Sequence, residues 1–294
     1  MNLLKKNNKR LNELPEEIDI LFRKLNIPSS VNKDEAWDRL LNKIANSSDQ
    51  PKIHSLSGYS LRYSFAAAII LLIIVSWFYI KFSTTTIICP IGKQINVVLP
   101  DNSKITLNAE TQIKYPKYFI FNSKKVLLDG EAIFLITKGD NFKVYDKRGN
   151  KVEVLGTQFN ITTRNNQFKV QCFEGIVKVT SYKGKSLNLI KGFTAEVLND
   201  SIRTNPLPPI ILEGPGWTKG EFFFESANLN DVLDELQRQF SIKVITFGFD
   251  PSNRTYTGVF YKKDLHEALK MVTIPMNLQY EFESDSVVIV KPNQ

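Results

Sequence analysis

The sequence predicts a membrane-anchored protein of several domains, and three observations support this fold class. One stretch of about 20 residues is almost entirely apolar, apolar residues before it repeat with the period of a helix, and those after it repeat with the period of a strand. The predicted parts are a short α-helical segment (1–62), one transmembrane helix (63–82), an all-β sandwich or rolled sheet (83–203), a linker (204–216) and a small α+β domain with a split βαβ arrangement (217–294).

The composition permits two folded domains and argues against a nucleic-acid-binding protein. The chain has 294 residues, of which 43% are hydrophobic, so it can form sizeable cores. Its formal net charge is +8, but lysines and arginines are mixed with acidic residues along the whole chain. Without a long basic run, we do not expect a groove for nucleic acid.

The transmembrane prediction rests on YSFAAAIILLIIVSWFYIKF at residues 63–82, which has no charged residue between Phe65 and Ile80. Tyr63 and Trp77 suit the two membrane interfaces, and Lys81 can extend to the lipid head groups. A buried core helix is the alternative, although it would normally be shorter or carry a polar stripe. Because the stretch begins at residue 63, we do not expect a cleaved signal peptide. Flanking positive charges are nearly balanced, with a small excess that favours a cytoplasmic N-terminus.

Two amphipathic helices are predicted before the apolar stretch. Each has apolar side chains on one face, the second follows a possible cap at Asn32, and residues 46–58 read as a linker. The two faces either pack against each other or are completed by a partner protein, and the sequence leaves both possibilities open. The apolar residues are Leu14, Ile18, Leu21, Phe22 and Leu25 in the first helix, and Trp37, Leu40, Leu41 and Ile44 in the second.

The residues after the apolar stretch predict two domains of different type. Short Val-, Ile- and Phe-rich segments separated by turn signals such as Asp129-Gly130 indicate an all-β domain that ends near Asp200. A segment rich in proline and glycine, RTNPLPPIILEGPG, predicts the linker. Strand and helix patterns then alternate, with a helical stripe after Asn228 and a final hairpin around Asp285, as in an α+β domain.

The stretch VEVLGTQFN at residues 152–160 is irregular. Apolar residues alternate through Val152 and Val154, and then resume on the other parity at Leu155, Phe159 and Ile161, with Gly156-Thr157 at the change. Glycine inside a strand commonly marks a β-bulge, so a bulge is the first interpretation.

Catalytic and metal motifs are missing from the sequence, so we predict that the protein is not an enzyme and binds no cofactor or metal. The two histidines, His54 and His266, belong to different predicted domains, and no phosphate loop, Rossmann fingerprint or Cys/His metal spacing occurs. Cys89 and Cys172 are the only cysteines. They are either free buried thiols or a single disulfide, and the sequence does not decide between the two.

A series of motifs in the all-β region resembles the FecR-type transmembrane anti-sigma regulators. LPDNSKITLN, DGEAIF, VLGTQFN, FEGIVKV and IKGFTAEV occur in the order found in that family. GWTKGEFFFESANLNDVLDELQRQF, from residue 216, is similar to the small domain that ends many members in polysaccharide-utilising bacteria. The chain departs from the family pattern at Asn102, where glycine is usual, and at Ile133-Phe134-Leu135.

The resemblance implies a single-pass protein of the inner membrane with a cytoplasmic N-terminus and periplasmic C-terminal domains. Its N-terminal segment would regulate an extracytoplasmic-function sigma factor, and its periplasmic part would receive a signal from the N-terminal domain of a TonB-dependent outer-membrane transporter. The side chains that we expect to anchor the sigma factor are Leu21, Phe22, Trp37 and Leu41. A carbohydrate-binding envelope protein is the alternative function, but such a protein has no use for the helical N-terminal segment.

The resemblance also gives the Gly156-Thr157 bond a second interpretation. In some relatives the equivalent bond breaks by itself, because the threonine hydroxyl attacks the preceding carbonyl carbon and the resulting ester hydrolyses. By that analogy Thr157 is the nucleophile and Gly156 the acyl donor.

Overall fold

The computed structural model describes residues 32–46, 58–120, 124–139, 141–198 and 201–293. The first predicted helix, with Leu21 and Phe22, lies outside these residues. The chain divides into two compact units, Met1–Ala68 and Ile69–Gln294, which we describe separately.

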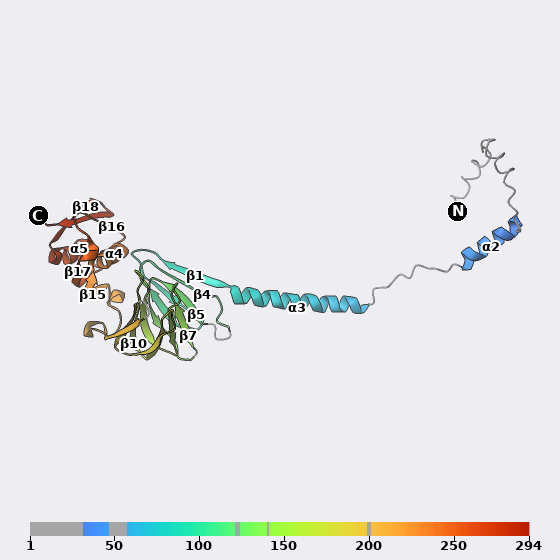
Figure 1. Ribbon diagram of the computed structural model, residues 1–294, viewed down its shortest axis with the longest axis horizontal. Helices are drawn as coiled ribbons and strands as arrows, with labels where there is room; N and C mark the ends of the chain where they lie inside the picture. Colours follow the sequence, from blue (N-terminus) through green and yellow to red (C-terminus); the bar gives the residue numbers. More distant parts are fainter. Residues whose placement is uncertain (1–31, 47–57, 121–123, 140, 199–200, 294) are drawn as a thin grey trace, which may run out of the picture. The chain divides into compact units, whose positions relative to one another are not determined.

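In the first unit, helix α2 spans Lys33–Asn46, as the sequence predicts (Figure 1). It begins directly after Asn32, whose carbonyl accepts a hydrogen bond from the Ala36 N–H at 2.9 Å. Acidic residues in the first turn and Lys43 in the last turn both stabilise the helix dipole. The sequence therefore determines both ends of this helix locally.

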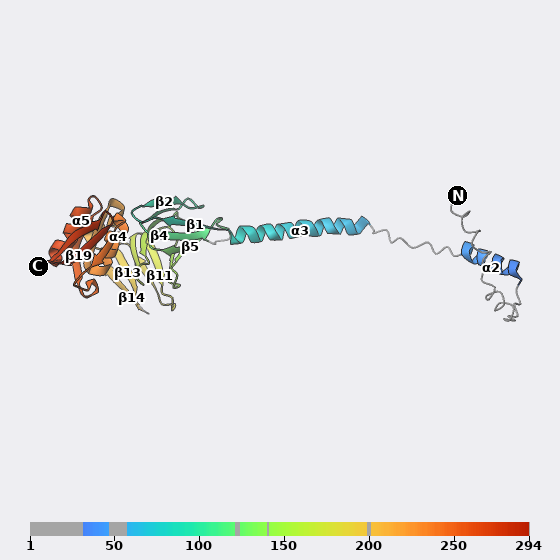
Figure 2. The same cartoon turned by 90° about the horizontal axis from the view of Figure 1, so that it is seen from above.

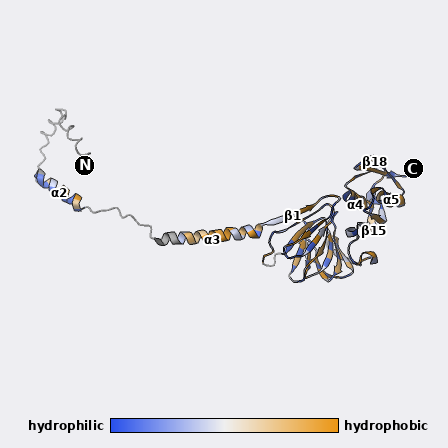
Figure 3. Ribbon diagram, turned by 180° about the vertical axis from the view of Figure 1, so that it is seen from behind, coloured by the Kyte–Doolittle hydropathy of each residue, from blue (hydrophilic) through white to orange (hydrophobic). Residues whose placement is uncertain are grey.

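Helix α3 spans Gly58–Phe82, and most of its residues from Phe65 to Ile80 are apolar; many of them are orange in Figure 3. It begins five residues before the predicted span of 63–82, because the polar residues before Tyr63 continue the same helix. The segment Tyr63–Phe82, of 20 residues, is long and apolar enough to cross a membrane. Near its end, the Lys81 ammonium lies 4.6 Å from the centre of the Trp77 ring.

In the described residues, fourteen strands after α3 form two sheets of seven strands each; Figures 1 and 2 show their arrangement. The first sheet contains, in spatial order, β1 (Thr84–Cys89), β4 (Thr111–Pro116), β5 (Lys125–Asp129), β7 (Phe142–Tyr145), β8 (Lys151–Val154), β11 (Ile176–Thr180) and β12 (Ser186–Ile190). The second contains β14 (Ser201–Pro206), β13 (Phe193–Leu198), β10 (Phe168–Glu174), β9 (Gln158–Thr162), β6 (Glu131–Leu135), β3 (Lys104–Leu107) and β2 (Ile95–Val98).

The two sheets pack face to face around one apolar core and so form a β-sandwich. Side chains alternate between core and exterior along most strands, as in β4, where Thr111, Ile113 and Tyr115 are buried. Phe134 from β6 and Phe159 from β9 are fully buried, and their stacked rings have centroids 5.0 Å apart. Of the two predicted all-β forms, the structure has the sandwich.

Part of the predicted linker belongs to the sandwich. Residues 201–206 form β14, which pairs with β13 along its whole length, and Leu207 is buried. We expected the domain to end near Asp200 and the linker to begin at residue 204, because proline-rich sequence rarely pairs in sheets. β14 accommodates Pro206 because it is an edge strand.

The strands of the sandwich begin and end at two opposite ends, which the register identifies. At the end that we call the helix end, Thr84 lies opposite Pro116, Lys125 opposite Lys143, and Leu135 opposite both Lys104 and Gln158. At the opposite end, which we call the domain end, lie the connections that follow Cys89, Leu107, Asp129 and Thr162.

The C-terminal part is an α+β domain, as predicted. β15 pairs with β17, and β16, β19 and β18 form a second small sheet in which β16 and β19 are parallel. The side chain of Asn228 accepts a hydrogen bond from the Asn230 N–H and so caps α4. The elements are β15 (Glu221–Asn228), α4 (Leu229–Phe240), β16 (Lys243–Thr246), β17 (Thr255–Tyr261), α5 (Leu265–Thr273), β18 (Leu278–Ser284) and β19 (Val287–Pro292), with short 3₁₀ helices at Pro209–Ile211, Gly216–Lys219, Pro251–Asn253 and Ile274–Met276.

Candidate functional site

Helix α2 carries the part of the predicted sigma-factor site that lies within the described residues. Trp37, Leu40, Leu41 and Ile44 follow the i, i+3, i+4, i+7 spacing of one helix face. Trp37 is 62% exposed and Leu41 50% exposed. These side chains therefore form an apolar stripe open to solvent, while the role of Leu21 and Phe22 stays a prediction.

The Gly156-Thr157 bond is not in a bulge, which corrects our first interpretation. The strand before it, β8, belongs to the first sheet, and the strand after it, β9, belongs to the second. Val152 and Val154 point into the core from one side, and Phe159 and Ile161 point into it from the other. The change of parity arises because the chain crosses between sheets here, whereas a bulge would keep it in one strand pair.

The backbone at this crossing requires glycine. Gly156 has φ +142°, and a Cβ there would lie 2.7 and 2.8 Å from atoms of Lys138. Thr157 is buried, and its Oγ1 has no hydrogen-bond partner among the described residues. The described histidine, His266, lies on α5 and contacts Tyr280, so it provides no base for this hydroxyl.

A buried ion-pair cluster joins the domain end of the sandwich to the α+β domain. Arg164, in the turn after β9, donates from Nη1 to Glu235 Oε2 on α4 at 2.7 Å. Arg238, one turn further along α4, donates to the same oxygen from Nε at 3.0 Å and from Nη2 at 2.9 Å. Glu235 is only 8% exposed. Its burial alone would raise its pKa, but the charges of Arg164 and Arg238 outweigh this and hold the pKa below its ordinary value.

Buried amide groups extend this cluster. Gln239 Nε2 donates to Asn108 Oδ1 at 2.9 Å and to Glu235 Oε1 at 2.8 Å. Asn108 and Asn160 donate in turn to Glu131 at 2.8 and 3.0 Å. A continuous network of hydrogen bonds therefore runs from α4 into strands β6 and β9 of the sandwich.

Trp217 covers the outer face of β9. It is buried, and its Nε1–H donates to Asn160 Oδ1 at 3.3 Å. Beside it, Gln94 Nε2 donates to the Trp217 carbonyl at 2.9 Å, and Lys262 Nζ donates to the Gly92 carbonyl at 2.7 Å. Burial lowers the pKa of Lys262. We call all these contacts together the polar interface.

Sequence analysis did not find the polar interface. Its partners are far apart in the chain, as Arg164 and Glu235 show, and no local motif connects them. One signal was present: Glu235 lies between Val232 and Leu236 of the apolar stripe of α4, where a charged residue requires a partner.

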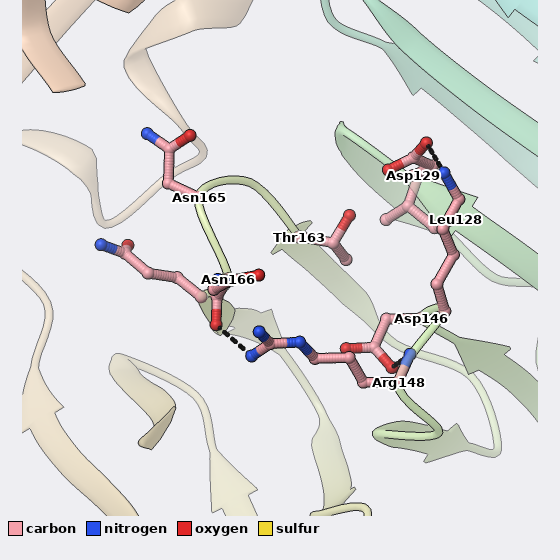
Figure 4. A pocket seen from close by; sticks show the side chains of 9 residues that line it. Leu128, Asp129, Asp146, Arg148, Thr163, Asn165 and Asn166 are labelled. Atoms are coloured by element: carbon pink, nitrogen blue, oxygen red, sulfur yellow. Dashed lines mark hydrogen bonds and ion pairs between the residues drawn. The ribbon is translucent and has the colours of Figure 1, made fainter. Parts of the chain in front are cut away.

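A small cavity of about 320 Å³ lies beside this interface (Figure 4). Most polar side chains that line this cavity form hydrogen bonds or ion pairs with neighbouring groups of the protein. Arg148 donates to the Asn166 carbonyl at 2.8 Å, Lys147 pairs with Asp129, and Asp146 accepts from the Arg148 and Asn150 N–H groups. Most of its charges are thus already compensated within the protein.

The described residues contain no group of three or more His, Cys, Asp or Glu that could hold a metal ion. Cys89 and Cys172 are both buried free thiols, which settles the choice left open by the sequence. Burial raises the pKa of both, that of Cys172 to about 11, so neither is a reactive thiolate at neutral pH.

The fold and the interface define a class of two-domain proteins in which a β-sandwich and an α+β domain are joined through buried polar groups. Comparison with protein-family models identifies both domains. Residues 85–178 match the model described as FecR protein, and residues 221–289 match the model described as FecR, C-terminal. Together these matches span more than half of the chain, and the protein belongs to the FecR family.

Comparison with solved structures gives the same fold. Crystal structures at 1.65 and 2.50 Å of a proposed anti-sigma factor from Parabacteroides distasonis ATCC 8503 each superpose with a TM-score of 0.65 and 22% sequence identity. The matches cover 71% and 72% of this chain and all of the other chain. No curated protein gives a significant match.

Proposed function

We propose that the chain is a membrane-anchored anti-sigma factor. The observation that carries this proposal is the order of its parts: an exposed apolar stripe on α2, then an apolar helix long enough to cross a membrane, then the two FecR-family domains. The relative from Parabacteroides distasonis, itself a proposed anti-sigma factor, supports the same role. The role is regulatory and requires no enzymatic activity.

In this proposal the chain crosses the inner membrane once, with α2 in the cytoplasm and the sandwich and α+β domain in the periplasm. The N-terminal segment binds an extracytoplasmic-function sigma factor and covers the surface with which that factor binds RNA polymerase. Trp37 and Leu41 fill apolar pockets of the sigma factor, as helix-in-groove interfaces do. The carbohydrate-binding alternative would leave the stripe on α2 without a use.

The test is co-purification of the full-length chain with candidate sigma factors from the same genome. Changing both Trp37 and Leu41 to Asp places two charges on the apolar stripe and is expected to reduce the retained sigma factor at least tenfold. The control is Asn42→Asp, which adds one negative charge on the opposite face of α2. Equal retention by the double variant and the wild type would reject the assignment of the site.

We further propose that the α+β domain receives the periplasmic signal from the N-terminal domain of a TonB-dependent transporter, with the sandwich as the second candidate. β18 is an edge strand of a small sheet, and edge strands can accept a strand from a partner.

The receiver role is tested with a chain that ends after Pro208, which lacks the α+β domain but keeps β14 and Leu207 in the sandwich. It is expected to bind the sigma factor and to ignore the inducer; a normal response would transfer the receiver role to the sandwich.

Self-cleavage at Gly156-Thr157 is a separate proposal, favoured by the buried Thr157 hydroxyl without a hydrogen-bond partner. Attack of Oγ1 on the Gly156 carbonyl carbon would break the peptide bond and form an ester, leaving the Thr157 amine free. Water would then release the Gly156 carboxylate. Because β8 and β9 contribute to one core, the two fragments would stay together until denatured.

Denaturing electrophoresis tests this proposal. Wild type and Thr157→Ser are expected to give two bands, and Thr157→Ala one band. A single band for wild type would reject cleavage.

A further inference from the structure

The helix end of the sandwich is held close to the end of the apolar helix by covalent connection. Only Ser83 separates Phe82, the last residue of α3, from Thr84, the first residue of β1. Consecutive Cα atoms are about 3.8 Å apart, so the start of β1, an edge strand of the sheet, lies within a few ångströms of the end of α3. The Lys117 N–H also donates to the Ser83 carbonyl at 2.9 Å, which fixes the start of the β4–β5 connection at the same place.

Exposed apolar side chains gather at this helix end. Six large apolar residues from six different strands or connections are exposed there, among them Leu155 at 66%, Val98 at 63% and Ile176 at 59%. Exposed apolar residues scattered singly need no explanation, but a group at one end of a domain marks an interaction surface. The six residues are Val98, Tyr118, Leu135, Leu155, Ile176 and Ile190.

Lysines surround these apolar residues. Lys104, Lys117, Lys125, Lys138 and Lys191 are exposed at the helix end. The acidic residues described there are Asp101, Glu153 and Glu174; Asp101 is paired with Lys124 at 3.2 Å and Glu153 with Lys143 at 3.0 Å. The surface is therefore positively charged, and apolar side chains beside lysines fit the head-group region of a membrane with anionic phospholipids.

We propose that the helix end of the sandwich is a membrane-binding surface, which lies on anionic lipid head groups with Leu155 and Ile176 inserted. This inference rests on the proposed anchoring of the chain by α3, because the anchor brings the surface to the bilayer. A free protein partner would not explain why the apolar and basic groups lie at the same end of the sandwich as the anchor.

The test measures the membrane depth of spin labels on the full-length chain, reconstituted in vesicles of phosphatidylcholine with roughly 30% phosphatidylglycerol. Labels are attached to Leu155→Cys and Ile176→Cys at the helix end, and to Ser186→Cys at the domain end as the matched control. A fourth label at Ile74→Cys lies within α3. Cys89 and Cys172 are buried, so the label reacts with the introduced thiol.

Oxygen dissolved in lipid is expected to relax the labels at residues 155, 176 and 74, whereas a water-soluble nickel complex relaxes the label at residue 186. If residue 74 is in lipid and residues 155 and 176 behave like residue 186, the surface proposal is overturned and the anchoring stands. If residue 74 is also in water, the anchoring itself is overturned. The use of two separate positions keeps the test valid when one variant does not fold.

The charge is tested with Lys117→Gln and Lys125→Gln in the chain labelled at residue 155. Each lysine near an anionic surface changes the ratio of lipid-bound to free states about fivefold, so each substitution is expected to lower this ratio by that factor. Pure phosphatidylcholine vesicles are expected to lower it further. A ratio that stays unchanged in both experiments would overturn the role of anionic lipid.

Discussion

The core of the sandwich and the polar interface are both buried, but they are built from opposite kinds of side chains. The core contains aliphatic and aromatic residues from both sheets, with Phe134 stacked on Phe159. The interface contains Glu235, two arginines and several amides. Apolar packing depends mainly on volume, whereas a buried ion pair depends on geometry and on the presence of every partner. The core of the sandwich should therefore tolerate changes that keep its volume, whereas the attachment of the α+β domain should depend on each of its polar partners.

The largest expected effect comes from the apolar core. Phe159→Ala removes one ring of the stacked pair and leaves a cavity, so the free energy of unfolding of the sandwich is expected to fall by about 4 kcal/mol. Urea denaturation followed by circular dichroism measures this change. The same truncation at Phe247, which is 70% exposed, is the control and is expected to change it by less than about 0.5 kcal/mol. Equal effects at the two positions would contradict the assignment of the core.

The second effect concerns the buried charge. Glu235→Gln leaves Arg164 and Arg238 buried without a counter-charge, and is expected to destabilise the docked α+β domain by about 3 kcal/mol. The change is measured by proteolysis of the connection at residues 208–216 and by hydrogen exchange on α4. The matched control is Glu281→Gln, because Glu281 forms an exposed pair with Lys291. Unchanged protection of α4 in Glu235→Gln would show that the cluster does not hold the domains together.

Acidic pH is also expected to weaken the docking of the α+β domain. The effect should be smaller than that of Glu235→Gln, because only a fraction of Glu235 is protonated. The pKa of Glu235 is lower in the folded protein than its ordinary value of 4.5. Its contribution to stability is therefore complete above pH 4.5 and is lost as the pH falls through the lower folded value. Protection of α4 is expected to decrease below pH 4.5 in the wild type more than in Glu235→Gln. Identical pH profiles would argue against ionised Glu235 at the interface.

The smallest effect concerns one hydrogen bond. Trp217→Phe keeps an aromatic ring against the sheet but removes the donor to Asn160, so docking is expected to weaken by about 1 kcal/mol. The same hydrogen-exchange measurement detects this change. An effect as large as that of Glu235→Gln would mean that the ring packing at Trp217, rather than the ion pair, dominates the interface.

Local patterns in the sequence were sufficient for elements that depend on their own residues. The stripe of Trp37 and Leu41 predicted α2, and the cap at Asn228 predicted the start of α4, because capping and helical periodicity act over a few residues. The apolar stretch after Tyr63 predicted the long helix in the same way.

Features that depend on distant residues were missed or misread. Residues 204–206 of β14 were assigned to the linker because Pro206 and the prolines after it suggest a loop, and only the pairing with β13 makes them part of a strand. Gly156 was read as a bulge because a sequence does not reveal that the chain leaves one sheet for the other. The ion pair between Arg164 and Glu235 has no local signature, since the two residues meet only after both domains have folded.

The single residue between α3 and β1 has a mechanical consequence. In the proposed anchoring, a force that pulls the α+β domain away from the membrane enters the sandwich at the domain end while the polar interface holds, and leaves it at Ser83. The covalent connection follows Pro206, which pairs with Phe193 near the helix end. β1 is joined to β4 by an antiparallel register from Thr84 to Cys89, so the force acts along the strands and loads many hydrogen bonds together. While the interface holds, the sandwich would transmit tension as a stiff element. Once it yields, the tension would pass through the edge strands β14 and β1, whose loaded ends both lie at the helix end.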